Sequence, residues 1–351
     1  MQNPFTTTFS KPPKYTYVAT EQPNEILESF SYDHPTESVY KITGVRGSGK
    51  TVILAKVEEE LRKKGWLVFD INPTRDTLQQ IASMLSNAGY SKNKEKNSSI
   101  IVSASVMGTG GRFGYSTSQT NDPYFDVGIA IENMIQEVQN RKKKILIGID
   151  EISKTDEMVK FASEYGRWLR ADYPVYLVCT GLYENIQQLS NVKNLTFFRR
   201  ATTIQTEPLN RILMTEMYKT KLHISIDIAK EMAAITKGYA FAFQELGVLS
   251  FKQGSNFKLK AIVPMLKAEL FAYSYEKIWE KLTNMDRLFV KQLTSKEEYK
   301  REEVLALMKD KAANYSVYRD RLIKRGILSS RQGYISLALP YFGEYIKEYC
   351  Q

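Results

Sequence analysis

Eight residues near the start of the chain have the types and spacing of a phosphate-binding loop. They match G-x-x-x-x-G-K-[ST] at every fixed position and are Gly44-Val45-Arg46-Gly47-Ser48-Gly49-Lys50-Thr51. Glycines let backbone N–H groups turn toward phosphates, and the N-terminus of a following helix adds partial positive charge. We expect Lys50 to reach the β- and γ-phosphates and the Thr51 hydroxyl to ligate Mg²⁺. The motif therefore predicts an ATP-binding site.

An acidic pair gives a second, independent signal. The apolar run Ile145–Ile149 (ILIGI) is typical of a buried strand, and it leads directly into Asp150 and Glu151. In an open parallel sheet, ligands bind at the carboxyl ends of the strands, which places this pair near the loop. We expect Asp150 to hold Mg²⁺ through water and Glu151 to polarise the attacking water. Together the motifs predict an ATPase with ATP and Mg²⁺ as cofactors.

Strand and helix patterns alternate around these motifs. Further strands are expected at Val39–Thr43, Trp66–Ile71 and Val175–Cys179. The helices expected between them cover Lys50–Lys64, Thr74–Asn87, a segment that starts at Asp122-Pro123, and Asp156–Arg170. This alternation predicts an α/β P-loop NTPase fold, a parallel sheet with helices on both faces.

We expect the chain to divide into three parts. Residues 1–208 form an ATPase core, which contains a glycine-turn hairpin at about 99–118. Residues 209–274 show helical patterns without strands and are called the helical lid. Residues 275–351 form a separate small domain, called the C-terminal module. The hairpin is either a surface ribbon or an element that engages DNA or another substrate.

The C-terminal module has the pattern of a winged helix. Helices are expected at Met285–Leu293, Arg301–Met308 and Asn314–Arg325, followed by a hairpin, the wing. In the third helix Val317, Leu322 and Ile323 are expected to face inward. The side chains expected to face DNA are Tyr315, Arg319, Lys324, Arg325 and, on the wing, Arg331.

Charge favours an acidic partner for this module. The chain has a net charge of +10, and from Phe251 to Gln351 there are 19 Lys and Arg against 12 Asp and Glu. A basic module suits the phosphate backbone of double-stranded DNA. Winged helices also dock proteins, and Asp320 dilutes the positive face of the third helix. A protein partner therefore stays open.

Composition excludes several other classes. Two cysteines, Cys179 and Cys350, cannot make a disulfide framework, and with His34 and His223 as the histidines we expect no Cys/His zinc site. The first 14 residues lack the apolar region of a signal peptide. No apolar run approaches the roughly 20 residues that a spanning helix needs, so we expect no membrane association and a cytoplasmic location.

Taken together, the chain resembles the AAA+ ATPases, on the branch that origin-recognition initiators share with the signalling STAND ATPases. It is similar to bacterial ATP-binding proteins of mobile elements, which join such a core to a C-terminal winged helix. The resemblance extends from Asn3-Pro4-Phe5 to Leu339-Pro340-Tyr341-Phe342. In that family the N-terminal segment often lies near the adenine.

The resemblance implies roles for further residues. Thr180, just past the strand VYLVC, matches sensor 1, a polar group that senses the γ-phosphate. Arg199 and Arg200 occupy the place of the arginine finger, which completes a neighbour's site in a homo-oligomer. The segment Gly238–Ala242 (GYAFA) stands where initiators have Gly-x-x-Arg and STAND proteins have Gly-x-Pro, but it has neither the arginine nor the proline.

Two functions follow from these expectations. The first is a nucleotide-dependent DNA-binding switch or remodeller. The second is a STAND-type signalling or scaffolding ATPase whose winged helix docks a protein partner. A third hypothesis, a P-loop kinase or small-molecule transferase, is disfavoured because the lid and the C-terminal module leave no obvious pocket for an acceptor.

Overall fold

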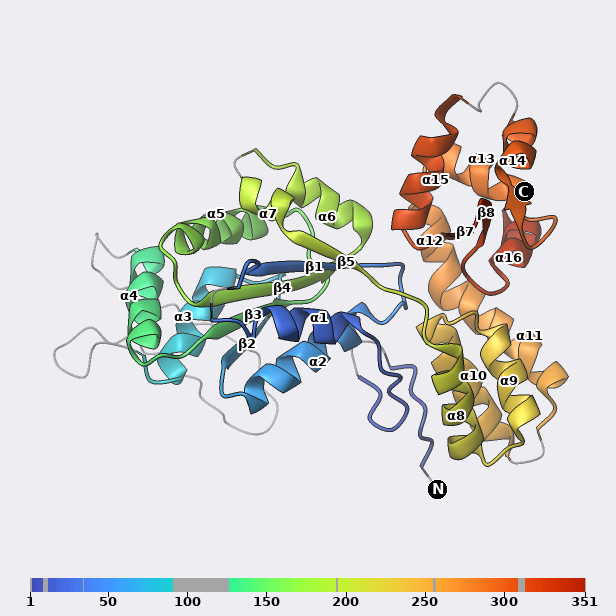
Figure 1. Ribbon diagram of the computed structural model, residues 1–351, viewed down its shortest axis with the longest axis horizontal. Helices are drawn as coiled ribbons and strands as arrows, with labels where there is room; N and C mark the ends of the chain where they lie inside the picture. Colours follow the sequence, from blue (N-terminus) through green and yellow to red (C-terminus); the bar gives the residue numbers. More distant parts are fainter. Residues whose placement is uncertain are drawn as a thin grey trace, which may run out of the picture.

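The structure is a computed structural model that describes residues 2–8, 12–33, 35–90, 126–193, 195–254, 257–308 and 313–350. Figure 1 shows the sheet and its flanking helices on the left and, on the right, the helical lid with the C-terminal module above it. The predicted hairpin at 99–118 lies outside the described residues.

A five-stranded parallel sheet forms the centre of the core. Its strands lie in the order β2 (Leu67–Ile71), β3 (Ile145–Ile149), β4 (Val175–Gly181), β1 (Val39–Thr43), β5 (Thr202–Gln205). The three inner strands are buried along their whole length, as expected of apolar runs in a sheet covered on both faces.

Side chains of the strands alternate between two hydrophobic clusters, one on each face. In β3, Ile145, Ile147 and Ile149 belong to one cluster and Leu146 to the other. The first face is covered by α3 (Thr77–Asn87), α4 (Val127–Asn140), α5 (Asp156–Arg170), α6 (Tyr183–Ser190) and α7 (Thr196–Arg200). The second face is covered by α1 (Gln22–Ser29) and α2 (Lys50–Lys63). The predicted α/β fold with helices on both faces is confirmed.

Capping explains where one helix prediction was wrong. α3 starts at Thr77 rather than Thr74, because the Asp76 side chain accepts the backbone N–H of Gln79. α4 begins at Val127, where the side chain of the extended Asp126 accepts the backbone N–H of Ile129, and the expected start at Asp122-Pro123 lies outside the described residues. The sequence patterns also missed α1, α6, α7 and the edge strand β5.

The lid and the C-terminal module share one hydrophobic cluster, which extends from Phe5 to Cys350. The lid contains α8 (Arg211–Leu222), α9 (Ile226–Ile235), α10 (Ala240–Gln253) and α11 (Leu259–Leu270). The module contains α12 (Glu276–Glu280), α13 (Asn284–Gln292), β6 (Tyr299–Lys300), α14 (Arg301–Met308), α15 (Tyr315–Lys324), β7 (Leu328–Arg331), β8 (Tyr334–Leu337) and α16 (Phe342–Tyr349).

A π-helix, η1 (Phe271–Tyr275), joins α11 directly to α12. The helical backbone therefore crosses the proposed boundary at residue 275 without a linker. In the module, three short strands pair antiparallel in the order β6-β8-β7. None of the helices in the described ranges is long and apolar enough to span a bilayer.

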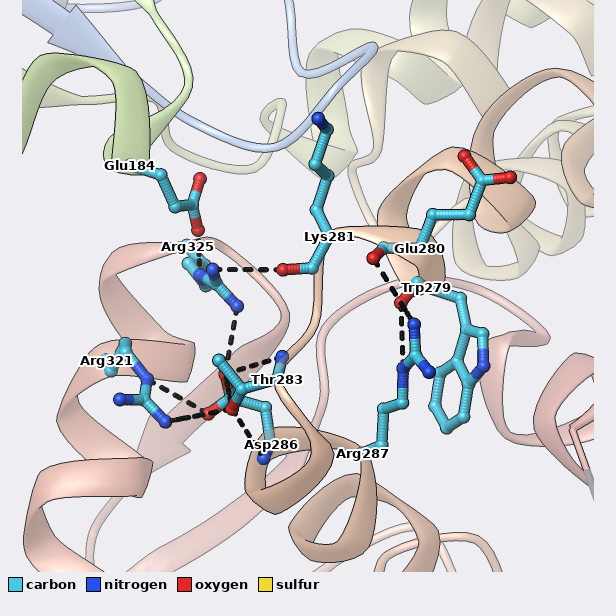
Figure 2. A network of polar contacts seen from close by, with 9 residues as sticks. All are labelled: Glu184, Trp279, Glu280, Lys281, Thr283, Asp286, Arg287, Arg321 and Arg325. Atoms are coloured by element: carbon cyan, nitrogen blue, oxygen red, sulfur yellow. Dashed lines mark hydrogen bonds and ion pairs between the residues drawn. The ribbon is translucent and has the colours of Figure 1, made fainter. Parts of the chain in front are cut away.

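A buried carboxylate connects the parts of the C-terminal module (Figure 2). Asp286 is fully buried in the first turn of α13, where it forms a capping box with Thr283. Arg321 Nε donates to one of its oxygens at 3.0 Å, and Arg325 Nη1 donates to the other at 3.1 Å. Arg325 also forms an ion pair with Glu184 of α6 in the core. The network thus joins α13 and α15 to the ATPase core.

Replacing Asp286 with alanine should lower the free energy of unfolding by about 3 kcal/mol, because two arginines lose their buried partner. Chemical denaturation measures the change. The matched control is Asp320→Ala, which removes an exposed carboxylate paired with Arg319 in the same module and should cost less than about 1 kcal/mol. Equal costs would show that the buried network does not hold the module together.

Candidate functional site

The phosphate-binding loop joins β1 to α2 at the carboxyl edge of the sheet. Gly47 and Gly49 have φ angles of 75° and 94°, in the left-handed region that side chains rarely adopt. Gly49 is the N-cap of α2, so the helix begins at Lys50. The Ser48 hydroxyl accepts from Thr206 at 2.9 Å, which ties the loop to the segment after β5. The loop therefore has the strand-to-helix position that the motif requires.

Lys50 is buried beneath the loop. It is 8% exposed, and its Nζ donates to the carbonyl oxygens of Gly44 at 3.1 Å and Val45 at 3.0 Å. Burial lowers the pKa of Lys50 to about 8, and the negative charges of Asp150 and Glu151 only partly oppose this shift. An anionic phosphate would be a stronger partner for this ammonium group than two neutral carbonyls.

Asp150 lies between two threonine hydroxyls. Thr51 Oγ1 donates to Asp150 Oδ2 at 2.8 Å, and Thr180 Oγ1 donates to Asp150 Oδ1. The strand order explains why these side chains are in contact, because β4, which carries Thr180, lies between β1 and β3. One carboxylate and one hydroxyl fit Mg²⁺, which takes few protein ligands and keeps several waters. Thr51 and Asp150 are thus placed where such an ion would bind.

Glu151 adopts a rare backbone conformation at the cavity. Its φ is 56°, although it is not glycine, and its backbone N–H donates to Thr180 Oγ1 at 3.1 Å. Its side chain is exposed and lines the cavity beside the loop. Backbone strain of this kind is concentrated at functional sites.

The cavity has a volume of about 450 Å³, and three parts of the chain contribute many of its lining residues. The phosphate-binding loop forms its floor, Thr6–Thr8 and Thr16–Val18 one wall, and Ala240, Phe241 and Gln244 of α10 another. Gln244 joins the last two parts, since its Oε1 accepts from the Thr6 N–H at 3.1 Å and from Thr16 Oγ1 at 3.0 Å. Phe5 itself is buried against the lid aromatics, so the residues after it line the cavity.

The lid contacts the loop through the segment Gly238–Ala242. Tyr239 Oη donates to the carbonyl oxygen of Arg46 at 2.6 Å, and the backbone N–H of Phe241 donates to that of Gly47 at 3.0 Å. These contacts form without the arginine or proline that the resembled families have here. The sequence patterns gave no role to Tyr239, Gln244 or Thr206, because such contacts depend on the folding of distant segments.

Arg199 and Arg200 are exposed at the end of α7, beside the edge strand β5. Neither lines the cavity of its own chain. Lys41 anchors this short helix, because its buried Nζ donates to the Phe198 carbonyl at 2.7 Å. The arrangement brings the two arginines to the surface and away from the phosphate-binding loop.

The predicted DNA-facing set is only partly exposed. Lys324 and Arg331 are exposed, and Arg319 is half-buried, with Nη2 donating to Ser330 Oγ at 2.7 Å. Tyr315 is 5% and Arg325 8% exposed. The expectation that these two side chains face DNA is therefore wrong. Tyr315 packs on Phe289, and Arg325 is paired with Asp286 and Glu184.

The exposure of Val317 shows that the predicted orientation of the third helix was wrong. Val317 was expected to face inward, but it is 58% exposed, while Leu322 is fully buried. The docking of Arg325 on Asp286 turns the opposite side of α15 inward. Periodicity alone could not indicate this rotation, since the helix has apolar residues on more than one side.

Comparisons with known proteins support the fold. A model of the KAP family P-loop domain matches residues 20–162, and one of a domain of unknown function (DUF8462) matches residues 272–346. No curated protein sequence matches the chain.

Solved structures extend the likeness over most of the chain. The Walker-type ATPase PABY2304 of Pyrococcus abyssi aligns with a TM-score of 0.62 and 11% identity, over 93% of this chain and 95% of its own. The ORC2 protein of Aeropyrum pernix in its ADP form aligns with a TM-score of 0.50 and 11% identity, over 97% of each chain. The chain therefore has a P-loop NTPase fold that matches AAA+ structures.

Replacing Lys50 with methionine should leave the unfolding temperature at pH 7 equal to that of the wild type or higher. The pKa of Lys50 is lowered on folding, so its desolvation costs stability below pH 8, and this cost fades as pH rises toward the ordinary lysine pKa. Thermal unfolding without ligand at pH 7 and pH 9.5 measures the effect. The advantage of the variant should shrink at the higher pH, and a clear loss at pH 7 would contradict the prediction.

Proposed function

We propose that this chain is a magnesium-dependent ATPase that acts as a nucleotide-controlled switch, with the C-terminal module as its output. The observation that carries the proposal is the 2.8 Å hydrogen bond between Thr51 on the loop and Asp150 after β3. It brings the magnesium-binding groups of two separate motifs together. The buried ammonium of Lys50 lies under the same loop, ready to exchange its carbonyl partners for phosphate oxygens.

Each residue of the site then has one role in hydrolysis. Bound Mg²⁺, held by Thr51 and Asp150, would offset charge on the phosphates. Glu151 accepts a proton from the water that attacks the γ-phosphorus. The new P–O bond forms as the bond between the γ-phosphorus and the bridging oxygen breaks, which releases ADP and phosphate. Thr180 keeps Asp150 and the Glu151 backbone in position through its two hydrogen bonds.

The remaining cavity suits the nucleoside. Its walls come from the N-terminal segment and from α10, beyond the loop that would hold the phosphates. Gln244 of α10 binds Thr6 and Thr16 of the N-terminal wall, so the two walls are joined, and a nucleotide held by them and by the loop would connect the lid to the core.

The C-terminal module docks close enough to the loop to respond to its state. A Cβ on Gly326, just after α15, would lie 3.4 Å from the backbone nitrogen of Val45 in the loop. Gln205 Nε2 donates to the Ile323 carbonyl at 2.7 Å, and Glu184 pairs with Arg325. A loop that rearranges around phosphates would therefore press directly on the end of α15.

Double-stranded DNA is the partner that we propose for this module. The proposal of a winged helix is supported by three helices, α13 to α15, that accompany the small antiparallel sheet β6-β8-β7. Lys324 at the end of α15 and Arg331 on the wing are exposed, and Arg319 is tied to the wing by Ser330. The module is also basic.

A protein partner is the alternative, and one observation favours it. On α15 the exposed residues include Val317, at 58%, and Asp320, which suit a protein surface better than a phosphate backbone. In this case the chain would be a STAND-type signalling or scaffolding ATPase. The surface position of Arg199 and Arg200 fits a finger offered to a neighbouring copy, so either function would be carried out by a head-to-tail oligomer.

Replacing Glu151 with glutamine should lower ATP hydrolysis by about 100-fold or more, because an amide cannot accept the proton of water. ATP affinity, measured by calorimetry, should stay within about threefold. The matched control is Glu157→Gln on α5, which lies off the cavity and should hydrolyse ATP like the wild type. Undiminished turnover in the Glu151 variant would rule out this residue as the base.

Replacing Lys324 and Arg331 together with alanine should weaken duplex binding at every DNA sequence and lower the salt slope by about two units. A salt titration of duplex binding with ATP measures the slope. The charge-matched control replaces Lys219 and Lys230, which are exposed on the lid, and should keep the wild-type slope. A wild type that binds no duplex at low salt would favour the protein partner.

A further inference from the structure

Tyr239 lies in a chain of hydroxyls that ends on the phosphate-binding loop. Its Oη is 2.6 Å from the Arg46 carbonyl oxygen and 2.6 Å from Ser274 Oγ. A carbonyl oxygen can only accept, so Tyr239 donates to Arg46 and Ser274 donates to Tyr239. Burial raises the pKa of Tyr239 above its usual range, so the hydroxyl keeps the proton that it donates.

This hydrogen bond determines the direction of a peptide group in the loop. The chain has no cis peptide bond in its described part, so the N–H of Gly47 points opposite to the carbonyl of Arg46. Arg46 and Gly47 line the cavity, whereas Tyr239 does not. With the carbonyl held by Tyr239, the Gly47 N–H points away from this hydroxyl, and a phosphate in the cavity would accept it.

The fit between lid and loop leaves little freedom for this peptide. A Cβ added to Gly47 would lie 2.5 Å from Tyr239 Oη and 2.9 Å from Phe241 Cβ. The Phe241 N–H holds the next carbonyl, that of Gly47, at 3.0 Å. Two consecutive loop carbonyls are thus bound from the lid, one by a side chain and one by the backbone.

We propose that Tyr239 is a positioning residue of the phosphate-binding loop, which orients the Gly47 N–H for an anionic phosphate and is itself held by Ser274. The inference rests on the proposed nucleotide binding and adds the residue that prepares the loop for it. Ser274 belongs to η1, the π-helix between the lid and the C-terminal module. π-Helical turns often occur at functional sites. The same hydroxyl therefore ties the loop to the segment that leads into the module.

The test compares Tyr239→Phe with a control that loses the same kind of bond elsewhere in the lid. Tyr218 is also fully buried, and its hydroxyl donates to the Phe243 carbonyl at 2.7 Å. Competition against a fluorescent ATP analogue gives the affinities of ATP and inorganic tripolyphosphate for both full-length variants. Melting temperatures report on the fold.

Tyr239→Phe should weaken ATP and tripolyphosphate by the same factor, about 5- to 10-fold, as expected for one lost hydrogen bond. Tyr218→Phe should change both affinities by less than about twofold. Ser274→Ala is a small change that keeps the Tyr239 ring, and it should weaken both ligands in the same direction, by about two- to threefold. This variant decides the matter if Tyr239→Phe does not fold.

Three results would overturn the inference. Tyr239→Phe and Ser274→Ala could both bind ATP like the wild type. The loss could be confined to ATP, which would indicate a lid that closes on the base instead. Tyr218→Phe could lose as much affinity as Tyr239→Phe. In each case a wild type that binds ATP keeps the proposed function, whereas a wild type that binds no nucleotide refutes the proposed function first.

Discussion

The hydrogen bonds of Asp150 are the constraint on which the rest of the site depends. This carboxylate accepts from Thr51 on the loop and from Thr180 on β4. Both contacts require the carboxyl ends of β1, β4 and β3 to lie at the same level along the edge of the sheet, which the parallel register provides. A slip of one residue in β4 or β3 would turn the Thr180 hydroxyl or the Asp150 carboxylate to the other face, and a slip in β1 would displace the loop that leads to Thr51. The apolar runs that fix the register therefore also set the geometry of the site.

A second constraint is that the loop is held by the segment after β5, by the lid and by the C-terminal module. Thr206 binds Ser48, Tyr239 and Phe241 bind two loop carbonyls, and Gly326 packs on Val45. Lid and C-terminal module share one hydrophobic cluster, so they can move as a unit. If the loop rearranges when nucleotide binds, this packing would carry the change to the lid and the C-terminal module, as the proposed switch requires.

The core and the loop could be predicted from sequence because their signals are local. The glycine spacing, the run ILIGI and the following acids identify the loop, β3 and Asp150 without any tertiary information. The contacts that orient the loop could not be predicted in this way. Tyr239 is 193 residues away from Arg46 in the chain, and α7, which carries Arg199 and Arg200, is too short to show a period.

The orientation of α15 could not be predicted from the sequence either, and it affects the charge that the module presents. Nothing in the sequence indicated that Arg325 would be buried, because its partners Asp286 and Glu184 lie 39 and 141 residues away. Other basic side chains of the module are also held in ion pairs, because Arg321 pairs with Asp286 and Lys296 pairs with Glu303. The acids of these internal pairs are already subtracted in the excess of basic residues, whereas Glu184 comes from the core and lowers by one the positive charge that the docked form offers to DNA.

Separation of the C-terminal module from the core would change the charge that the module presents. The Arg325–Glu184 pair joins the module to the core, and the other ion pairs named here lie within the module. Separation of α15 from α6 would break this one pair and leave Arg325 with a single carboxylate, which it shares with Arg321. The module would then carry one more uncompensated positive charge, beside Lys324. If DNA is the partner, the docked form is the weaker binder, and the contact between Gly326 and Val45 is where nucleotide could shift the equilibrium between the two forms.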